Sequence, residues 1–81
     1  MGEKTLRDVK PRESARIVKV GGAGSIRRRL MDMGLVAGSE ITVQRVAPLG
    51  DPIEIRLKGY NLTLRKEEAS SILVEPVGDR T

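Results

Sequence analysis

The sequence predicts a mainly β fold, in which five or six short strands form a small barrel with one inserted α-helix and short helical turns. Three observations predict it. The chain has 81 residues and no cysteine, so it supports one small core without disulfides. Apolar and polar residues alternate with a period of two through most of the second half of the chain. One segment ahead of that half has the period of a helix.

The first elements expected are a short helical turn and a strand. Residues 5–9 are typical of a capped turn with Asp8 at the third helical position. Residues 15–20 are rich in β-branched side chains and predict the first strand. The facing of this strand is ambiguous, because the adjacent Ile17 and Val18 cannot both point inward along one regular pleat.

A helix is predicted near residues 25–33. Apolar side chains recur at i, i+4 and i+7 from Ile26, which places them on one helical face. Gly34 stands where a helix often ends in a left-handed glycine. Leu35 would then fold back on Leu30 as the apolar contact of a Schellman motif.

The second half predicts short strands joined by turns, and closure into a barrel would leave no strand edge uncovered. In chain order we expect a strand around Ile41 and Val43, a turn-rich loop at 47–52, a strand at 53–57, a tight hairpin at 58–61, a strand at 62–65, a helical turn at 66–71 and a last strand at 72–74. The core should include Ile26, Leu30, Leu35, Ile41, Val43, Ile53, Ile55, Leu62, Leu64 and Ile72.

Composition argues against an enzyme. Histidine and cysteine are both absent, which removes the usual nucleophile, the usual base near neutral pH and the ordinary ligands of zinc and iron. We therefore expect no cofactor and no tight metal binding. No apolar run approaches the ~20 residues of a transmembrane helix, and the N-terminus lacks the apolar stretch of a signal peptide. These features predict a cytoplasmic protein.

The net charge of +4, with ten arginines among fifteen basic residues, favours acidic partners. The alternative is an ordinary charge for solubility. Tyr60 is the only aromatic residue. One ring cannot form the stacking platform that binders of single-stranded nucleic acid use, so nucleic acid is a disfavoured partner.

Arg27, Arg28, Met31 and Leu49 are the candidate partner-binding residues. At about 100° per residue, Arg28 lies about 200° from Ile26 on the helix, facing outward. Met31 falls beside Arg27 and Arg28, off the apolar face, where it would be an apolar anchor among charges. Leu49 lies on a turn, where a large side chain is difficult to bury. The alternatives are a solvated charged face, a Met31 covered by a loop, and a Leu49 folded over one end of the barrel.

A glycine-rich segment and a set of carboxylates each have a functional interpretation and an ordinary structural one. Residues 21–25, glycine-rich and followed by a helix, could cradle a phosphate, but they lack the P-loop ending, and a flexible connection between strand and helix is the favoured explanation. Asp32, Glu67 and Glu68 are the carboxylates nearest the helical segments. We expect them to be surface charges, because adjacent glutamates on a helix do not face one site.

Residues 30–41, Leu-Met-Asp-Met-Gly-Leu-Val-Ala-Gly-Ser-Glu-Ile, form a pattern that resembles the FeoA family of bacterial ferrous iron uptake. Residues 47–53 resemble that family's loop of proline and glycine, residues 59–65 its next hairpin, and residues 69–74 its closing turn and strand. The set in order, and not any single motif, carries the resemblance.

The resemblance implies one SH3-like domain over residues 1–81, with its core at 5–77. It implies a non-enzymatic accessory or regulatory protein of ferrous iron uptake that binds FeoB, a membrane iron permease with a cytosolic GTPase domain. Homo-oligomers are compatible with it. Two alternatives stay open: a basic nucleic-acid-binding barrel, and a GTPase-activating protein in which one of the three arginines at 27–29 acts on FeoB.

Overall fold

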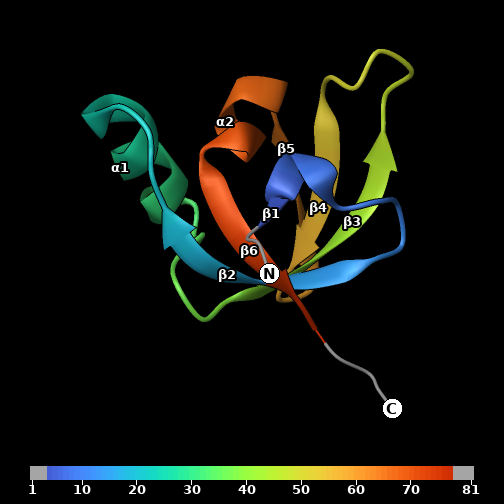
Figure 1. Cartoon of the computed structure of the whole chain (residues 1–81), viewed down its shortest axis with the longest axis horizontal. Helices are drawn as coiled ribbons and strands as arrows, with labels where there is room; N and C mark the ends of the chain where they lie inside the picture. Colours follow the sequence, from blue (N-terminus) through green and yellow to red (C-terminus); the bar gives the residue numbers. More distant parts are fainter. Residues whose placement is uncertain (1–3, 78–81) are drawn as a thin grey trace.

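The computed structural model describes residues 4–77. Its strands form one six-stranded antiparallel sheet in the order β1-β6-β2-β3-β4-β5, which curves strongly around the core (Figure 1). The mainly β prediction with one inserted helix is confirmed. The elements are β1 (Lys4–Thr5), the 3₁₀ helix η1 (Leu6–Asp8), β2 (Ser14–Val20), α1 (Gly24–Asp32), β3 (Glu40–Val46), β4 (Ile53–Leu57), β5 (Tyr60–Leu64), α2 (Lys66–Ser70) and β6 (Ile72–Pro76).

The two ends of the sheet, β1 and β5, are not joined by a ladder within residues 4–77. Instead, η1 and α2 pack against each other, and Figure 1 shows them side by side. Their side chains Leu6 and Ala69 are fully buried. The prediction that closure leaves no strand edge uncovered is therefore wrong, because the sheet stays open between β1 and β5 and two short helices complete the core there.

The core confirms eight of the ten predicted residues, while Ile26 and Leu62 are only half-buried against it. Leu57, which alternates with Arg56 and Lys58 in the sequence, is also fully buried. Sequence reasoning did not assign the other buried apolar residues, which come mainly from the first twenty positions and from the last turn and strand: Leu6, Val9, Ala15, Ile17, Val20, Ala69 and Val74.

A β-bulge resolves the ambiguous facing of β2. Ile17 pairs with Val74 of β6 and Lys19 pairs with Leu73, so Val18 is an extra residue on β2. The pleat is therefore interrupted: Ile17 is buried, Val18 and Lys19 are both exposed, and the strand returns to the core at Val20.

The end of α1 is the Schellman motif that the sequence predicts. Gly34 has a φ of 95° and its N–H donates to the carbonyl of Met31 at 2.9 Å. The N–H of Leu35 donates to the carbonyl of Leu30 at 3.1 Å, and both leucine side chains are fully buried. This motif fixes the direction in which the chain leaves α1.

Two other local predictions are confirmed. The hairpin between β4 and β5 turns at Lys58 and Gly59, both with positive φ, as a type I′ turn requires. The carboxylate of Asp8 accepts the N–H of Thr5 at 3.1 Å, which caps η1.

Within residues 4–77, the helices are too short and too polar to cross a membrane. The expectation about a signal peptide concerns the first residues of the sequence, of which 1–3 lie outside the described part.

Candidate functional site

The exposed surface of α1 carries three of the four predicted partner-binding residues. Leu30 anchors the helix in the core, while Arg27, Arg28 and Met31 are exposed. Because the Schellman end and the buried leucine fix the helix, these side chains project from a rigid element. Arg28 and Arg27 have no carboxylate within 4.0 Å among the described residues.

Arg29 and Glu68 form a separate ion pair, and the expectation that Glu68 is a surface charge is wrong. A guanidinium nitrogen of Arg29 lies 3.2 Å from one carboxylate oxygen of Glu68, whose side chain is only 7% exposed. The other oxygen accepts the N–H of Arg65 at 2.9 Å. Glu68 is buried because it caps α2 and at the same time faces α1. Glu67 and Asp32 are exposed, as expected.

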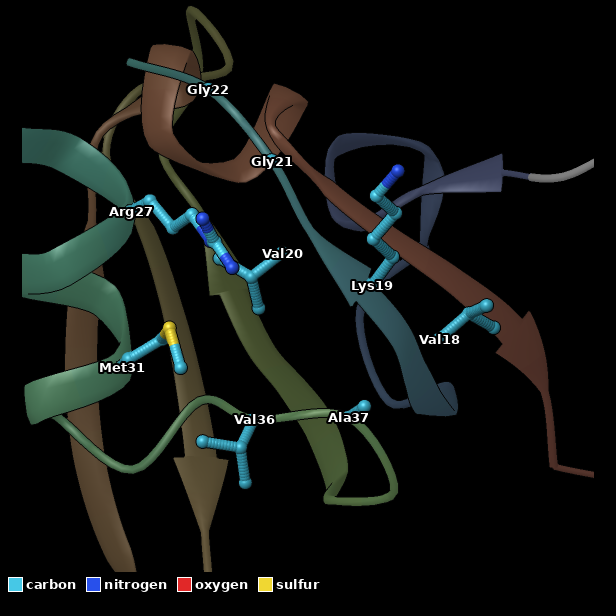
Figure 2. Close-up of a pocket in the computed structure, with 9 residues that line it drawn as sticks. All are labelled: Val18, Lys19, Val20, Gly21, Gly22, Arg27, Met31, Val36 and Ala37. Carbon is cyan, nitrogen blue, oxygen red and sulfur yellow. The ribbon is translucent and has the colours of Figure 1, made fainter. Parts of the chain in front are cut away.

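A groove separates α1 from β2. Its volume is about 400 Å³, and its lining comes from β2, the loop after it, α1 and the loop before β3: Val18, Lys19, Val20, Gly21, Gly22, Arg27, Met31, Val36 and Ala37. Figure 2 shows Arg27 and Met31 extending from α1 toward β2, whereas Val18 and Lys19 point away from the helix.

The groove gathers exposed apolar surface and positive charge. Val18, Met31 and Val36 are three of the five large apolar side chains that are exposed within residues 4–77. Among the residues that the structure describes, Lys19 and Arg27 are its charged lining residues and no carboxylate lines it. A second hollow on α1 has mixed charge, because Asp32 lines it together with Arg27 and Arg28. The unbalanced positive charge therefore lies on the groove side.

Sequence reasoning found Arg27 and Met31 but missed the opposite wall of the groove. The ambiguous Ile17-Val18 pair was the available signal, since a bulge exposes Val18 and Lys19 together. Val36 gave no signal, because its place depends on how the chain crosses from α1 to β3.

Leu49 is not part of this surface. It lies in the loop between β3 and β4, which Figure 1 shows on the opposite side of the molecule from α1. The structure therefore does not bring Leu49 together with Arg27, Arg28 and Met31. Its side chain is 89% exposed, so the alternative in which it folds over one end of the barrel is wrong.

Packing accounts for Gly22 in the loop before α1. The N–H of Gly21 donates to the carbonyl of Ser71 at 2.7 Å. Gly22 has a φ of 95°, and a Cβ there would lie 2.8 Å from the Ser71 hydroxyl. The loop is glycine-rich because it passes close to the turn between α2 and β6, which is the structural alternative to a phosphate cradle.

The described part of the chain contains no cluster of three acidic side chains close enough to share a metal ion. The charged clusters there are ion pairs. Arg16 of β2 bridges Glu40 of β3 at 3.6 Å and Glu75 of β6 at 3.2 Å. Arg45 lies 3.7 Å from Glu54 across the β3–β4 pair.

Comparison with known proteins gives a consistent result. A family model of the FeoA domain matches residues 4–76. A Porphyromonas gingivalis protein, named as a fusion of Fe(2+) transport protein A with the Fe(2+) transporter FeoB, is 48% identical over 63 residues. The match covers 78% of this chain but only 8% of the fusion protein.

Two solved structures extend this result to the fold. A FeoA-like protein from Clostridium acetobutylicum has a TM-score of 0.87 and 40% identity, over 100% of this chain and 94% of that one. The Stenotrophomonas maltophilia FeoA, solved with zinc, has a TM-score of 0.79 and 29% identity over 89% of both chains. That protein is described as a prokaryotic SH3 domain protein and a suggested activating factor of ferrous iron transport. The expected SH3-like barrel is therefore confirmed.

Proposed function

This chain belongs to the FeoA family, and from that premise we propose that it is a non-enzymatic accessory protein of ferrous iron uptake that binds the cytosolic GTPase portion of a FeoB-type transporter. The fusion relative carries the proposal, because there a segment like this chain is covalently joined to FeoB. Joining two partners keeps them at high effective concentration, which helps when they act together. The proposed place of action is the cytoplasmic face of the membrane.

The proposed docking surface is the α1 face formed by Arg27, Arg28 and Met31. Two exposed arginines would steer the chain toward an acidic surface and accelerate encounter. Met31, 43% exposed, would supply the apolar contact. The mechanism is recognition: the residues on this face offer charge and apolar area, and no residue of the chain is assigned a catalytic step. Leu49 would be a second, separate contact.

The experiment measures binding of the chain to the cytosolic portion of FeoB, with and without GTP. An Arg28→Glu, Met31→Asp double variant should fold, because both side chains face away from the core. It should lose at least ~2 kcal/mol of affinity, or about 30-fold, if Met31 is a central contact. Arg7→Glu changes an exposed arginine on η1 and serves as the matched control.

Leu49→Asp tests the β3–β4 loop independently. Equal binding by the folded double variant and the wild type would contradict the α1 surface and move the interface toward the strands around Arg56 and Arg65. GTP hydrolysis by FeoB, followed in the same mixtures, tests the alternative of an arginine finger. Such a finger would accelerate hydrolysis by about 10³-fold or more, and the acceleration would vanish on changing one arginine among 27–29.

A further inference from the structure

The groove side of β2 carries an unpaired strand edge. The ladder between β2 and β3 runs from Ser14 to Arg16 only. Beyond it, Ile17 makes the last two bonds on that side: its N–H donates to Ser39 and its carbonyl accepts from Gly38, both at 2.8 Å. The chain then diverges from β2, so residues 18–20 have no backbone partner on this side within the described part of the protein.

The side of β2 to which the free N–H and C=O groups point follows from the hydrogen bond of the next residue, Gly21. The N–H of Gly21 donates to Ser71, on the β6 side of the strand. Since N–H and C=O groups of successive residues in a strand point to opposite sides, those of Val20 point away from β6 and toward α1. The edge therefore presents a main-chain donor and acceptor to the groove.

The groove is bounded by α1 on its other side. Met31 and Val36 give it apolar walls, and Arg27 and Lys19 give it positive charge, with no carboxylate of residues 4–77 in its lining. An extended segment placed along β2 would alternate its side chains between two faces. One set would meet Met31 and Val36 on the helix side, and the other would meet Lys19, which points away from the helix (Figure 2).

We propose that an extended segment of the FeoB-type partner, with apolar and acidic residues in alternation, adds as a strand to the edge of β2 at residues 18–20. This inference rests on the proposed function and specifies its mode of recognition. Main-chain hydrogen bonds to Val20 would supply affinity, while the apolar walls and the two cations would select the side chains. Arg27 and Met31 line this groove as well as the hollow that they share with Arg28, so they would contact the added strand from the groove side of α1.

The first test uses a synthetic probe, the peptide acetyl-Glu-Val-Glu-Ile-Glu-Val-Glu-amide, titrated into ¹⁵N-labelled chain. Saturable shifts are expected at the amides of Val18, Val20, Arg27, Met31 and Val36. Exchange of the Val20 amide hydrogen with solvent should slow by at least about tenfold at saturation, since it gains a hydrogen-bond partner. A peptide with lysine in place of every glutamate should bind more weakly.

Backbone methylation separates strand addition from side-chain docking. Two peptides carry N-methyl groups on alternate residues, one on the odd and one on the even positions. Only one of these sets faces β2, so that peptide should lose about tenfold or more in affinity while the other binds like the parent. Equal binding by all three peptides, or shifts confined to another face, would overturn the proposal.

Substitutions at two exposed positions locate the peptide-binding site without disturbing the core. Val36→Glu puts a negative charge into the groove from a side chain that is 39% exposed, and should weaken the peptide at least about tenfold. Leu49→Glu makes the same kind of change on the far side of the molecule and should leave peptide binding unchanged. If the Val20 amide became protected with rising concentration of the chain alone, the occupant would be a second copy, which would also overturn the proposal.

The second test repeats the exchange measurement with the cytosolic portion of FeoB. Protection at Val20, lost in Val36→Glu, supports the inference. Binding of FeoB with unchanged exchange at Val20 overturns strand addition and leaves the proposed function standing. Absence of FeoB binding, together with peptide binding in the groove, overturns the proposed function and this assignment of the occupant.

Discussion

Replacement of Glu68 tests how firmly α1 is fixed to the barrel. Its two carboxylate oxygens have different partners: one accepts the Arg65 N–H at the start of α2, and the other lies 3.2 Å from Arg29 of α1. Glu68→Ala removes both interactions, whereas Glu68→Gln keeps an oxygen for the Arg65 N–H. The exposed neighbour Glu67 provides the matched control, Glu67→Ala.

The two interactions differ in expected size. Loss of a capping interaction costs about 1 kcal/mol of unfolding free energy. The ion pair contributes at most about 1 kcal/mol, because the Arg29 side chain is 65% exposed and water screens it. Glu68→Ala should therefore lose about 1–2 kcal/mol and Glu68→Gln at most about 1 kcal/mol, while Glu67→Ala should stay within about 0.5 kcal/mol of wild type.

Urea unfolding followed by circular dichroism measures these differences, and thermal unfolding checks them. For a domain of this size, each kcal/mol lowers Tm by about 4–8 °C. A double-mutant cycle combining Arg29→Ala with Glu68→Gln isolates the ion-pair contribution. Equal stability of Glu68→Ala and Glu67→Ala would refute the reasoning, because it would mean that neither interaction contributes.

Two further predictions follow from the glycines and from composition. Gly34→Ala should lose about 1–2 kcal/mol, since φ there is 95° and a Cβ would lie 3.2 Å from both Leu57 and Tyr60. Gly24→Ala, at the first position of α1 with open space around it, should be neutral or stabilising in the same urea assay, and equal losses at both sites would contradict the argument. Anaerobic calorimetry with Fe²⁺, and calorimetry with Zn²⁺, should detect no submicromolar site at one ion per chain, because histidine and cysteine are absent. Detection of such a site would contradict this prediction, because it would show that carboxylates suffice to bind the ion tightly.

The elements that could be predicted are those specified by neighbours in the sequence. Gly34 and Leu35 determine the end of α1 through left-handed backbone and a local apolar contact. The alternation from Ile53 to Leu57 determines which face of β4 is buried. Local patterns could not show that Leu6 belongs to the core, because its burial depends on η1 meeting α2, about sixty residues later in the chain.

Only part of the candidate site could be predicted, again because the rest depends on contacts between residues distant in the sequence. Helical periodicity places Arg27, Arg28 and Met31 on the exposed side of α1, and the structure agrees. Glu68 could not be recognised as buried, because its second partner, Arg29, is distant in sequence. Leu49 could be recognised as exposed but not located, since a loop's place relative to α1 depends on the curvature of the sheet.

The free edge of β2 arises from two features that act together, one local and one that depends on strand pairing. The Schellman end at Gly34 directs the chain away from α1, and the connection reaches β3 through Gly38, at a φ of 94°, so that pairing with β2 begins only at the Arg16–Glu40 pair. The bulge at Val18 then keeps β2 running past that point beside β6 and returns Val20 to the core. A strand that continued its ladder with β3 to residue 20 would have no groove beside it. The inserted helix therefore has a consequence for function: it holds one wall of the groove at the place where the sheet leaves a strand edge unpaired.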